Sequence, residues 1–257
     1  MPAPRTYKTE VIVIRQISFG EADRILTLYS PDLGKIRAVA KGIRRHKNKL
    51  RGQLELVSRA SVSISRGRNL DTISEAKTID SYRPVREELE RLTIGLYLAE
   101  LTDNFTVEQA SNESIYLLLV ETLELLGNSI NLHNLMRRFE LNLLKHSGFD
   151  PELYHCIECQ NELEQRDHLF SCPSGGVVCT NCRSSTDVLL PLSVNSMKFL
   201  RFVEREPLFE NLENLKVSTK SQTEVQHLLR TYLRYVSAVS YTHLRAHETE
   251  ADLVCRL

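Results

Sequence analysis

Apolar residues alternate with polar ones, or gather in short β-branched runs, throughout the first 80 residues of the chain. This period of two is typical of strands with one buried face. Five such runs cover residues 10–14, 24–30, 35–42, 54–65 and 70–82. Because an irregular stretch follows the third run, the pattern predicts a small five-stranded barrel of the OB type, with an SH3-like barrel as the alternative.

From residue 84 onward the apolar residues follow the longer period of amphipathic helices. Helices are predicted over residues 89–101, 114–126, 131–146, 193–206 and 222–235. Gly148 and Pro151 end the third helix, and a cysteine-containing segment follows at residues 152–187. The predicted fold class is therefore α+β with several domains. An N-terminal OB-type β-barrel occupies residues 1–82, and an α-helical domain with the inserted cysteine module occupies residues 83–236.

Two pairs of cysteines occupy this module, Cys156 with Cys159 and Cys179 with Cys182. Two residues separate the partners of each pair, and nineteen residues, 160 to 178, separate the pairs. A two-residue gap lets both sulfurs turn toward one point, so two such knuckles supply four thiolates to a tetrahedral site. The spacing predicts one structural zinc ion, Zn²⁺, with no open position for a substrate.

Other roles for the cysteines fit the pattern less well. Redox pairs usually occur singly at a strand-to-helix junction, whereas this chain has two pairs. Cys172 lies between the pairs, and we expect it to be a thiol near the site, since the paired cysteines already fill four positions. His155 and His168 are weaker candidates to replace a cysteine as a metal ligand, on the same argument.

Composition is that of a soluble globular protein, since 42% of the residues are hydrophobic and 26% are charged. No apolar run approaches the ~20 residues that a membrane helix needs. The first residues contain no apolar signal core, so we expect a cytosolic protein. In that compartment cysteines serve better as metal ligands than in disulfides.

The net charge of zero conceals an uneven distribution. Residues 1–80 hold 16 basic and 8 acidic residues, a balance of +8, and the remainder holds 17 basic and 25 acidic residues, a balance of −8. No acidic residue lies between Asp32 and Glu55. Eight cations lie in that interval: Lys35, Arg37, Lys41, Arg44, Arg45, Lys47, Lys49 and Arg51. A solvated charge run is the alternative, but ordinary surfaces intersperse both signs, so this basic segment predicts binding to the phosphate backbone of a nucleic acid.

Aromatic residues are sparse in the predicted barrel, which contains only Tyr7, Phe19, Tyr29 and Tyr82. Single-strand binders usually stack bases on aromatic rings, so we expect backbone electrostatics to carry most of the affinity. The sequence has no Walker loop, no Gly-x-Ser-x-Gly and no His-Glu-x-x-His motif. We therefore expect a binding protein with no catalytic residues rather than an enzyme.

The last residues, 237–257, contain two histidines and a lone cysteine but no clean apolar face. They are similar to translated adaptor sequence, so we predict that this segment is not native. A genuine short helix is the alternative.

Several stretches of the chain form a recognisable set of motifs: residues 10–14 and 19–25 (FGEADRI), 40–45 (AKGIRR), 50–55 (LRGQLE), 145–149 (KHSGF), 170–171, 175–179 (GGVVC) and 228–236. In these stretches the chain resembles the RecO family of bacterial DNA repair proteins. The resemblance covers residues 8–236. The extra Cys172 and the segment after residue 236 depart from the pattern of the family.

The resemblance implies a recombination mediator that binds single- and double-stranded DNA through an OB-fold and promotes annealing. Its partners would be RecR and single-strand binding protein, and indirectly RecA, which it helps to load onto coated strands. It would lie in the bacterial cytoplasm, associated with the nucleoid. Two other classes remain open from the residues alone: a zinc-ribbon RNA-binding or ribosome-associated protein, and a zinc- or thiol-dependent enzyme.

Overall fold

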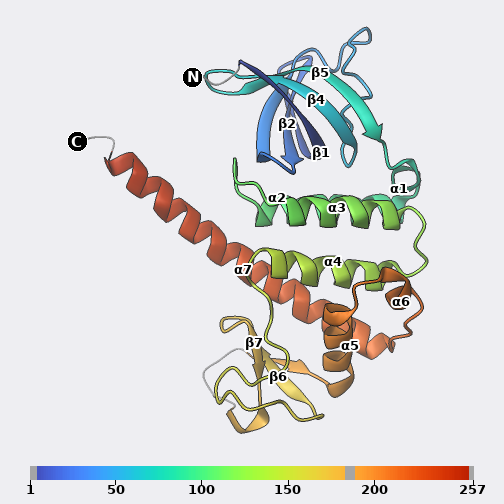
Figure 1. Cartoon of the computed structure of the whole chain (residues 1–257), viewed down its shortest axis with the longest axis vertical. Coiled ribbons are helices and arrows are strands. Elements are labelled where there is room, and N and C mark those ends of the chain that lie inside the picture. The colour runs from blue at the N-terminus through green and yellow to red at the C-terminus, as the bar shows by residue number, and fades with distance from the viewer. Residues whose placement is uncertain (1–4, 183–188, 255–257) are drawn as a thin grey trace. The chain divides into compact units, whose positions relative to one another are not determined.

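The chain forms two compact units, residues 1–129 and 130–257. The structure is a computed structural model, and it describes residues 5–182 and 189–254, with side chains as far as residue 239. Figure 1 shows the strands of the first unit followed by its helices, and in the second unit a small sheet that lies to one side of α4 (Leu132–His146) and α7 (Thr219–Val254). None of the described helices combines the length and the apolar character that crossing a lipid bilayer requires.

A closed five-stranded barrel forms the first part of the first unit, as the alternating pattern predicts. Its strands are β1 (Thr6–Phe19), β2 (Asp23–Ser30), β3 (Gly34–Ala40), β4 (Arg59–Ser65) and β5 (Asp71–Asp80). The strand order around the barrel is β1-β2-β3-β5-β4, and β3 pairs with β5 in parallel. The prediction of an OB-type barrel is confirmed.

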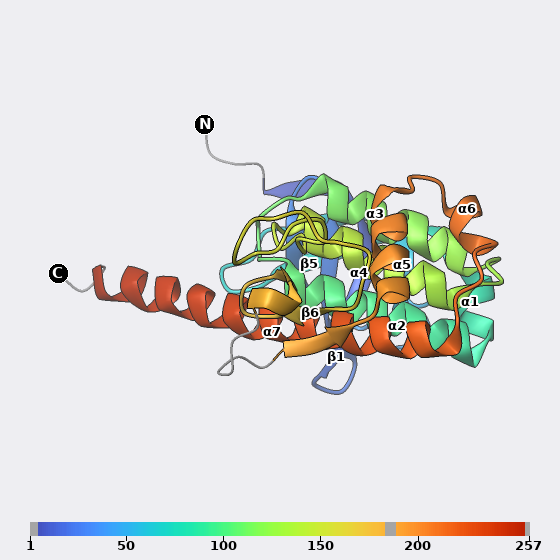
Figure 2. The same ribbon diagram turned by 90° about the horizontal axis from the view of Figure 1, so that it is seen from below.

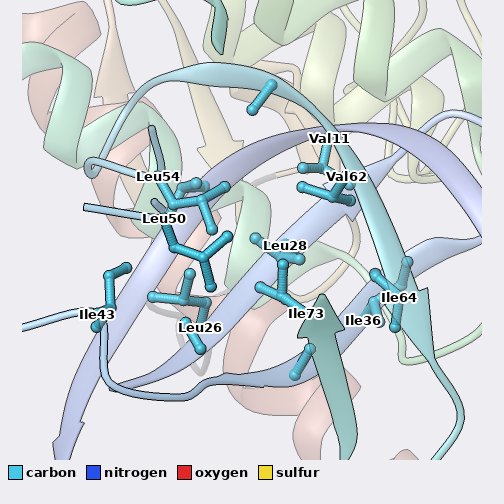
Figure 3. Packing of buried hydrophobic residues seen from close by; sticks show 14 residues of the cluster. Val11, Leu26, Leu28, Ile36, Ile43, Leu50, Leu54, Val62, Ile64 and Ile73 are labelled. Carbon is cyan, nitrogen blue, oxygen red and sulfur yellow. The ribbon is translucent and has the colours of Figure 1, made fainter. Parts of the chain in front are cut away.

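Small and branched apolar side chains fill the inside of the barrel (Figure 3). They are Val11, Val13, Leu26, Leu28, Ile36, Ala38, Ala40, Ile43, Leu50, Leu54, Ala60, Val62, Ile64 and Ile73. Every second residue of a strand points inward, so Lys35 and Arg37 lie on the opposite face of β3 from Ile36 and Ala38.

A bulge interrupts β1 and changes which of its side chains point inward. Val13 pairs with Leu28, but Arg15 pairs with Thr27, so Ile14 is the extra residue. Directly paired residues share a face of a sheet. Val13 therefore lies inside with Leu28, whereas Arg15 and the odd-numbered residues after it lie on the outer face of the barrel.

The prediction that the fourth strand begins at residue 54 is wrong, because β4 begins at Arg59. Residues 41–58 form a chain of turns instead, with backbone hydrogen bonds such as Asn48 N to Arg45 O at 3.1 Å. Leu50 and Leu54 point from these turns into the barrel core. Their apolar character therefore reflects a loop that closes the barrel rather than a strand.

Three helices complete the first unit: α1 (Arg83–Glu87), α2 (Leu89–Phe105) and α3 (Glu113–Leu126). α2 packs on β1, and Asn112 caps α3 by accepting a hydrogen bond from Ile115 N. A polar network joins α3 to the barrel. The Tyr116 hydroxyl donates to Glu10 Oε1 at 2.5 Å, and Arg59 Nε donates to the same oxygen at 2.7 Å.

The second unit is helical with one inserted three-stranded sheet, β7-β6-β8. Its elements are α4 (Leu132–His146), β6 (His168–Ser171), β7 (Gly176–Val178), the 3-10 turn η1 (Thr180–Cys182), β8 (Leu189–Leu192), α5 (Val194–Arg205), α6 (Phe209–Glu213) and α7 (Thr219–Val254). Asn131 and Ser193 cap α4 and α5 through their side chains. The predicted helices at 131–146 and 193–206 are confirmed within one residue at each end.

α7 is much longer than the predicted helix at 222–235 and runs without a break in both views (Figure 1, Figure 2). It continues through most of the segment predicted to be non-native, whose side chains from residue 240 lie outside the described part of the chain. A helical backbone does not distinguish native from foreign sequence. The predicted origin of residues 237–257 and the predicted domain boundary at residues 82–83 both stay predictions.

Candidate nucleic-acid interface and metal centre

The structure brings the two cysteine pairs together. The sulfur atoms of Cys156, Cys159, Cys179 and Cys182 all lie within 4.8 Å of one another. The distance from Cys159 Sγ to Cys179 Sγ is 3.9 Å. Four sulfurs placed about 2.3 Å from a tetrahedral zinc ion would lie about 3.8 Å apart. The cluster therefore has the size of a four-thiolate metal site.

Backbone pairing holds the two knuckles in register. β7 lies against the segment that carries the first knuckle, since Val177 N donates to Glu152 O at 2.9 Å and Ile157 N donates to Val177 O at 3.0 Å. A side chain on Gly176 would place its Cβ 2.5 Å from the Ile157 side chain. Glycine at this position lets the two strands approach, and the approach directs both cysteine pairs to one point.

The electrostatics of the cluster favour a bound cation. Burial raises the pKa of the Cys156 thiol, but hydrogen bonds from backbone N–H groups, first that of Cys159 and then that of Cys179, lower it to about 6. Hydrogen bonds with the Cys179 and Cys159 thiols raise the pKa of Cys182 to about 12. Thiols packed this closely cannot all ionise unless a positive charge lies among them. A four-sulfur donor set suits a soft or borderline divalent metal.

The other residues near the module have different roles. Cys172 is buried, and burial raises the pKa of its thiol; it is not one of the four clustered cysteines. His168 lies on β6, with its Nε2 2.9 Å from Glu164 O. His155 is exposed, with its Nδ1 3.7 Å from Glu152 Oε1. Neither histidine belongs to the cysteine cluster among the described residues.

Most of the predicted cations gather on one loop. Six of the eight are exposed and form no ion pair within the described part of the chain. They are Lys41, Arg44, Arg45, Lys47, Lys49 and Arg51, which we call the loop cations. All six follow β3 in the chain of turns at residues 41–58. This concentration of unpaired positive charge is suited to contacts with phosphates.

The other two predicted cations have partners inside the first unit. Lys35 Nζ donates to Asp103 O at 2.6 Å and lies 3.0 Å from Asp103 Oδ1, and only 12% of its side chain is exposed. Arg37 lies 3.8 Å from Glu108 Oε1, and both side chains are about half exposed. Lys35 is therefore tied to α2, whereas Arg37 forms only a long, solvated contact.

Phe19, one of the four aromatic residues of the predicted barrel, is a surface residue to which the sequence alone assigned no role in binding. Its side chain lies at the end of β1 and is 51% exposed, and Ile17 on the same outer face is 44% exposed. Strand periodicity alone would place both residues in phase with the buried Val11 and Val13. The only local signal was the turn-forming sequence Gly-Glu-Ala at residues 20–22, which directly follows Phe19.

Comparison with known proteins finds similarity over nearly the whole chain. The family described as "Recombination protein O N terminal" matches residues 3–82, and "Recombination protein O C terminal" matches residues 86–245. A protein named "DNA repair protein RecO" from Dehalococcoides mccartyi (strain CBDB1) is 39% identical over 236 residues, which cover 92% of each chain. Proteins of the same name from Roseiflexus sp. (strain RS-1) and Desulforamulus reducens are 35% and 34% identical, each over 90% of this chain and over 81% and 90% of their own lengths.

Proposed function

Since the chain belongs to the RecO family of DNA repair proteins, we propose that it is a recombination mediator that binds DNA and catalyses no reaction itself. Its ligands are single- and double-stranded DNA, which it anneals. Its protein partners are RecR and single-strand binding protein, and it helps to load RecA onto strands that single-strand binding protein coats. It acts in the bacterial cytoplasm at the nucleoid.

The observation that carries this proposal is the group of six loop cations. Each is exposed and has no ion-pair partner among the described residues, so its charge is available to a phosphate. Backbone hydrogen bonds and the buried Leu50 and Leu54 hold the loop against the barrel. Contacts of this kind bind many sequences alike, as a mediator that works at any damaged site requires.

In this proposal the metal is one zinc ion with a structural role. Cys156, Cys159, Cys179 and Cys182 would hold it, and the ion would fix the fold of the cysteine module. The module is small: its strands β6 and β7 have four and three residues. Small modules of this kind gain folding free energy from the metal itself.

Two measurements test the function. The first compares affinity for single-stranded DNA with affinity for RNA of the same sequence and length, because an OB-type barrel can bind RNA equally well. We expect tighter binding to DNA. The second asks whether the protein, single-strand binding protein and DNA form a ternary complex on which RecA assembles faster. Preference for RNA together with no ternary complex would instead support an RNA-binding role.

A further inference from the structure

A surface hollow of about 750 Å³ lies at the end of the barrel where β1 turns into β2. Residues 19–23 form one wall, and Arg44 and Arg45 form the other. Hollows of this volume are large enough for a small organic ligand. The hollow therefore combines an exposed aromatic ring, Phe19, with two of the loop cations.

Two hydrogen bonds fix the walls of the hollow relative to each other. Gly42 N donates to Asp23 Oδ1 at 2.7 Å, and Arg44 N donates to Ala22 O at 3.0 Å. Gly42 has a φ of 63°, and a Cβ at this position would lie 2.9 Å from Asn48 Nδ2. A glycine is therefore needed where the chain leaves β3 and turns toward the hollow. The site is largely preformed, which lowers the entropic cost of binding a ligand.

The ring of Phe19 is exposed because of the bulge in β1. The bulge directs Arg15, Ile17 and Phe19 to the outer face, where they share a surface with Arg37 on β3. Bulges that re-aim side chains are common beside functional sites. OB-type barrels bind oligonucleotides with the face of strands 2 and 3 and with two loops, the one between strands 1 and 2 and the one between strands 4 and 5. The hollow lies at the first of these loops.

The charges around the hollow indicate how a ligand would lie. Glu21 and Asp23 offset Arg44 and Arg45, so the hollow itself has no excess charge. Asp23 is already engaged by Gly42 N. The excess positive charge of this loop is carried by the other loop cations, of which Lys41 and Lys47 each lie three residues from Arg44 in the sequence. This arrangement suits a ligand with a neutral flat part and a chain of anionic groups next to it.

We propose that this hollow receives an unpaired base of single-stranded DNA, which stacks on the ring of Phe19 while the neighbouring phosphates contact the loop cations. This inference rests on the proposed function, since it names one subsite of the DNA surface. Duplex DNA gains nothing from the subsite, because its bases are already stacked and paired. Phe19 thus gives the barrel a preference for single strands that phosphate contacts alone do not supply.

The absence of tryptophan from the chain allows a direct test. In the full-length variant Phe19→Trp the introduced indole is the only one, and bases that stack on it quench its fluorescence. We expect oligo(dT) to quench the emission and an abasic strand with the same number of phosphates to leave it unchanged. Fluorescence anisotropy of labelled DNA measures binding in the same samples. Bound DNA without quenching, or equal quenching by the abasic strand, would overturn the proposal.

Affinity measurements give a second test. We expect Phe19→Ala to weaken binding to single strands about fivefold or more and to leave duplex binding unchanged. A loss of about fivefold is the lower end of what stacking one base contributes. Phe19→Leu should bind single strands as weakly as Phe19→Ala, because leucine keeps apolar bulk but has no π face. Ile79→Ala, at a residue of the barrel that is 47% exposed, is the matched control and should keep wild-type affinity. Full affinity of the leucine variant would refute stacking.

These outcomes separate the inference from the function on which it rests. If the wild-type protein binds no DNA at all, the proposed function fails. If it binds DNA with a steep dependence on salt but the Phe19 variants bind single strands normally, the function stands and the base subsite is wrong. Thermal unfolding of each variant checks that the fold is intact, as the exposure of Phe19 leads us to expect.

Discussion

Neutralising three of the loop cations is the most direct test of phosphate binding by the barrel. In the variant Arg44→Gln/Arg45→Gln/Lys47→Gln, three side chains keep their polarity and most of their length but lose their charge. All three are exposed and have no ion-pair partner among the described residues. We expect no loss of stability from their replacement. Any loss of DNA affinity therefore reports on the interface.

The expected magnitude follows from the number of loop cations. Each phosphate that is neutralised on a single strand contributes about −0.7 to the slope of log affinity against log salt. Six contacts give a slope of about −4, and three give about −2. Between 50 mM and 200 mM salt the wild-type affinity should therefore fall roughly 300-fold and that of the triple variant roughly 20-fold.

Lys35 provides a matched control, because it belongs to the same basic segment but is bound to Asp103. Lys35→Gln should leave the salt slope unchanged. It should lower the free energy of unfolding by about 1–3 kcal/mol, since it removes a charge-assisted hydrogen bond from a poorly exposed site. The two variants thus separate a cation that contacts DNA from one that holds α2 on the barrel.

Fluorescence anisotropy with labelled strands of unrelated sequence, titrated at several salt concentrations, gives the slopes. The triple variant should lose the same factor for every sequence, because phosphates carry no sequence information. A slope that the triple substitution leaves unchanged would refute the assignment. A slope that Lys35→Gln flattens as much as the triple variant does would refute the division between the two kinds of cation.

Two further predictions concern stability. Cys159→Ser should reduce the zinc content below one ion per chain and destabilise the second unit, whereas Cys172→Ser should retain one ion. Mass spectrometry measures the metal content, and the reverse result would exclude the assigned ligands. Burial alone would raise the pKa of Glu10, but hydrogen bonds from Tyr116 and Arg59 lower it below its usual value. The stabilisation that results is complete above the usual pKa of about 4.5 and is lost as the pH falls through the lowered pKa. Urea unfolding of Glu10→Gln should therefore show a deficit of up to about 1 kcal/mol at neutral pH that disappears in acid, and a deficit independent of pH would contradict this account.

Local patterns predicted the features that depend on neighbours in the sequence. The cysteine spacing led to a cluster whose sulfurs lie within 4.8 Å, because a knuckle is defined by residues only three apart. The helices at 131–146 and 193–206 begin where Asn131 and Ser193 provide caps. The strand pattern predicted the barrel for the same reason, since alternation is itself a local property.

Features that depend on distant residues could not be predicted in this way. Lys35 has the same type of neighbours as the loop cations, but its partner Asp103 lies on a helix 68 residues further along the chain. Leu54 has the apolar character of a strand residue, yet it belongs to a loop that fills the end of the barrel. In both cases the outcome is decided by what packs against the residue, which the sequence does not state.

The bulge in β1 is a further feature that strand alternation does not predict, and it bears on the proposed binding site. A regular strand would direct Val11, Val13, Arg15, Ile17 and Phe19 to the same face, because side chains alternate with a period of two. Phe19 would then fill the barrel, and Arg15 would be buried among apolar side chains at a cost of several kcal/mol. The extra residue, Ile14, avoids that cost by turning Arg15 outward, and the same change of phase exposes Ile17 and Phe19. An aromatic ring beside the loop cations is thus a consequence of accommodating a charged residue in the strand, and that consequence provides the platform on which we expect a base to stack.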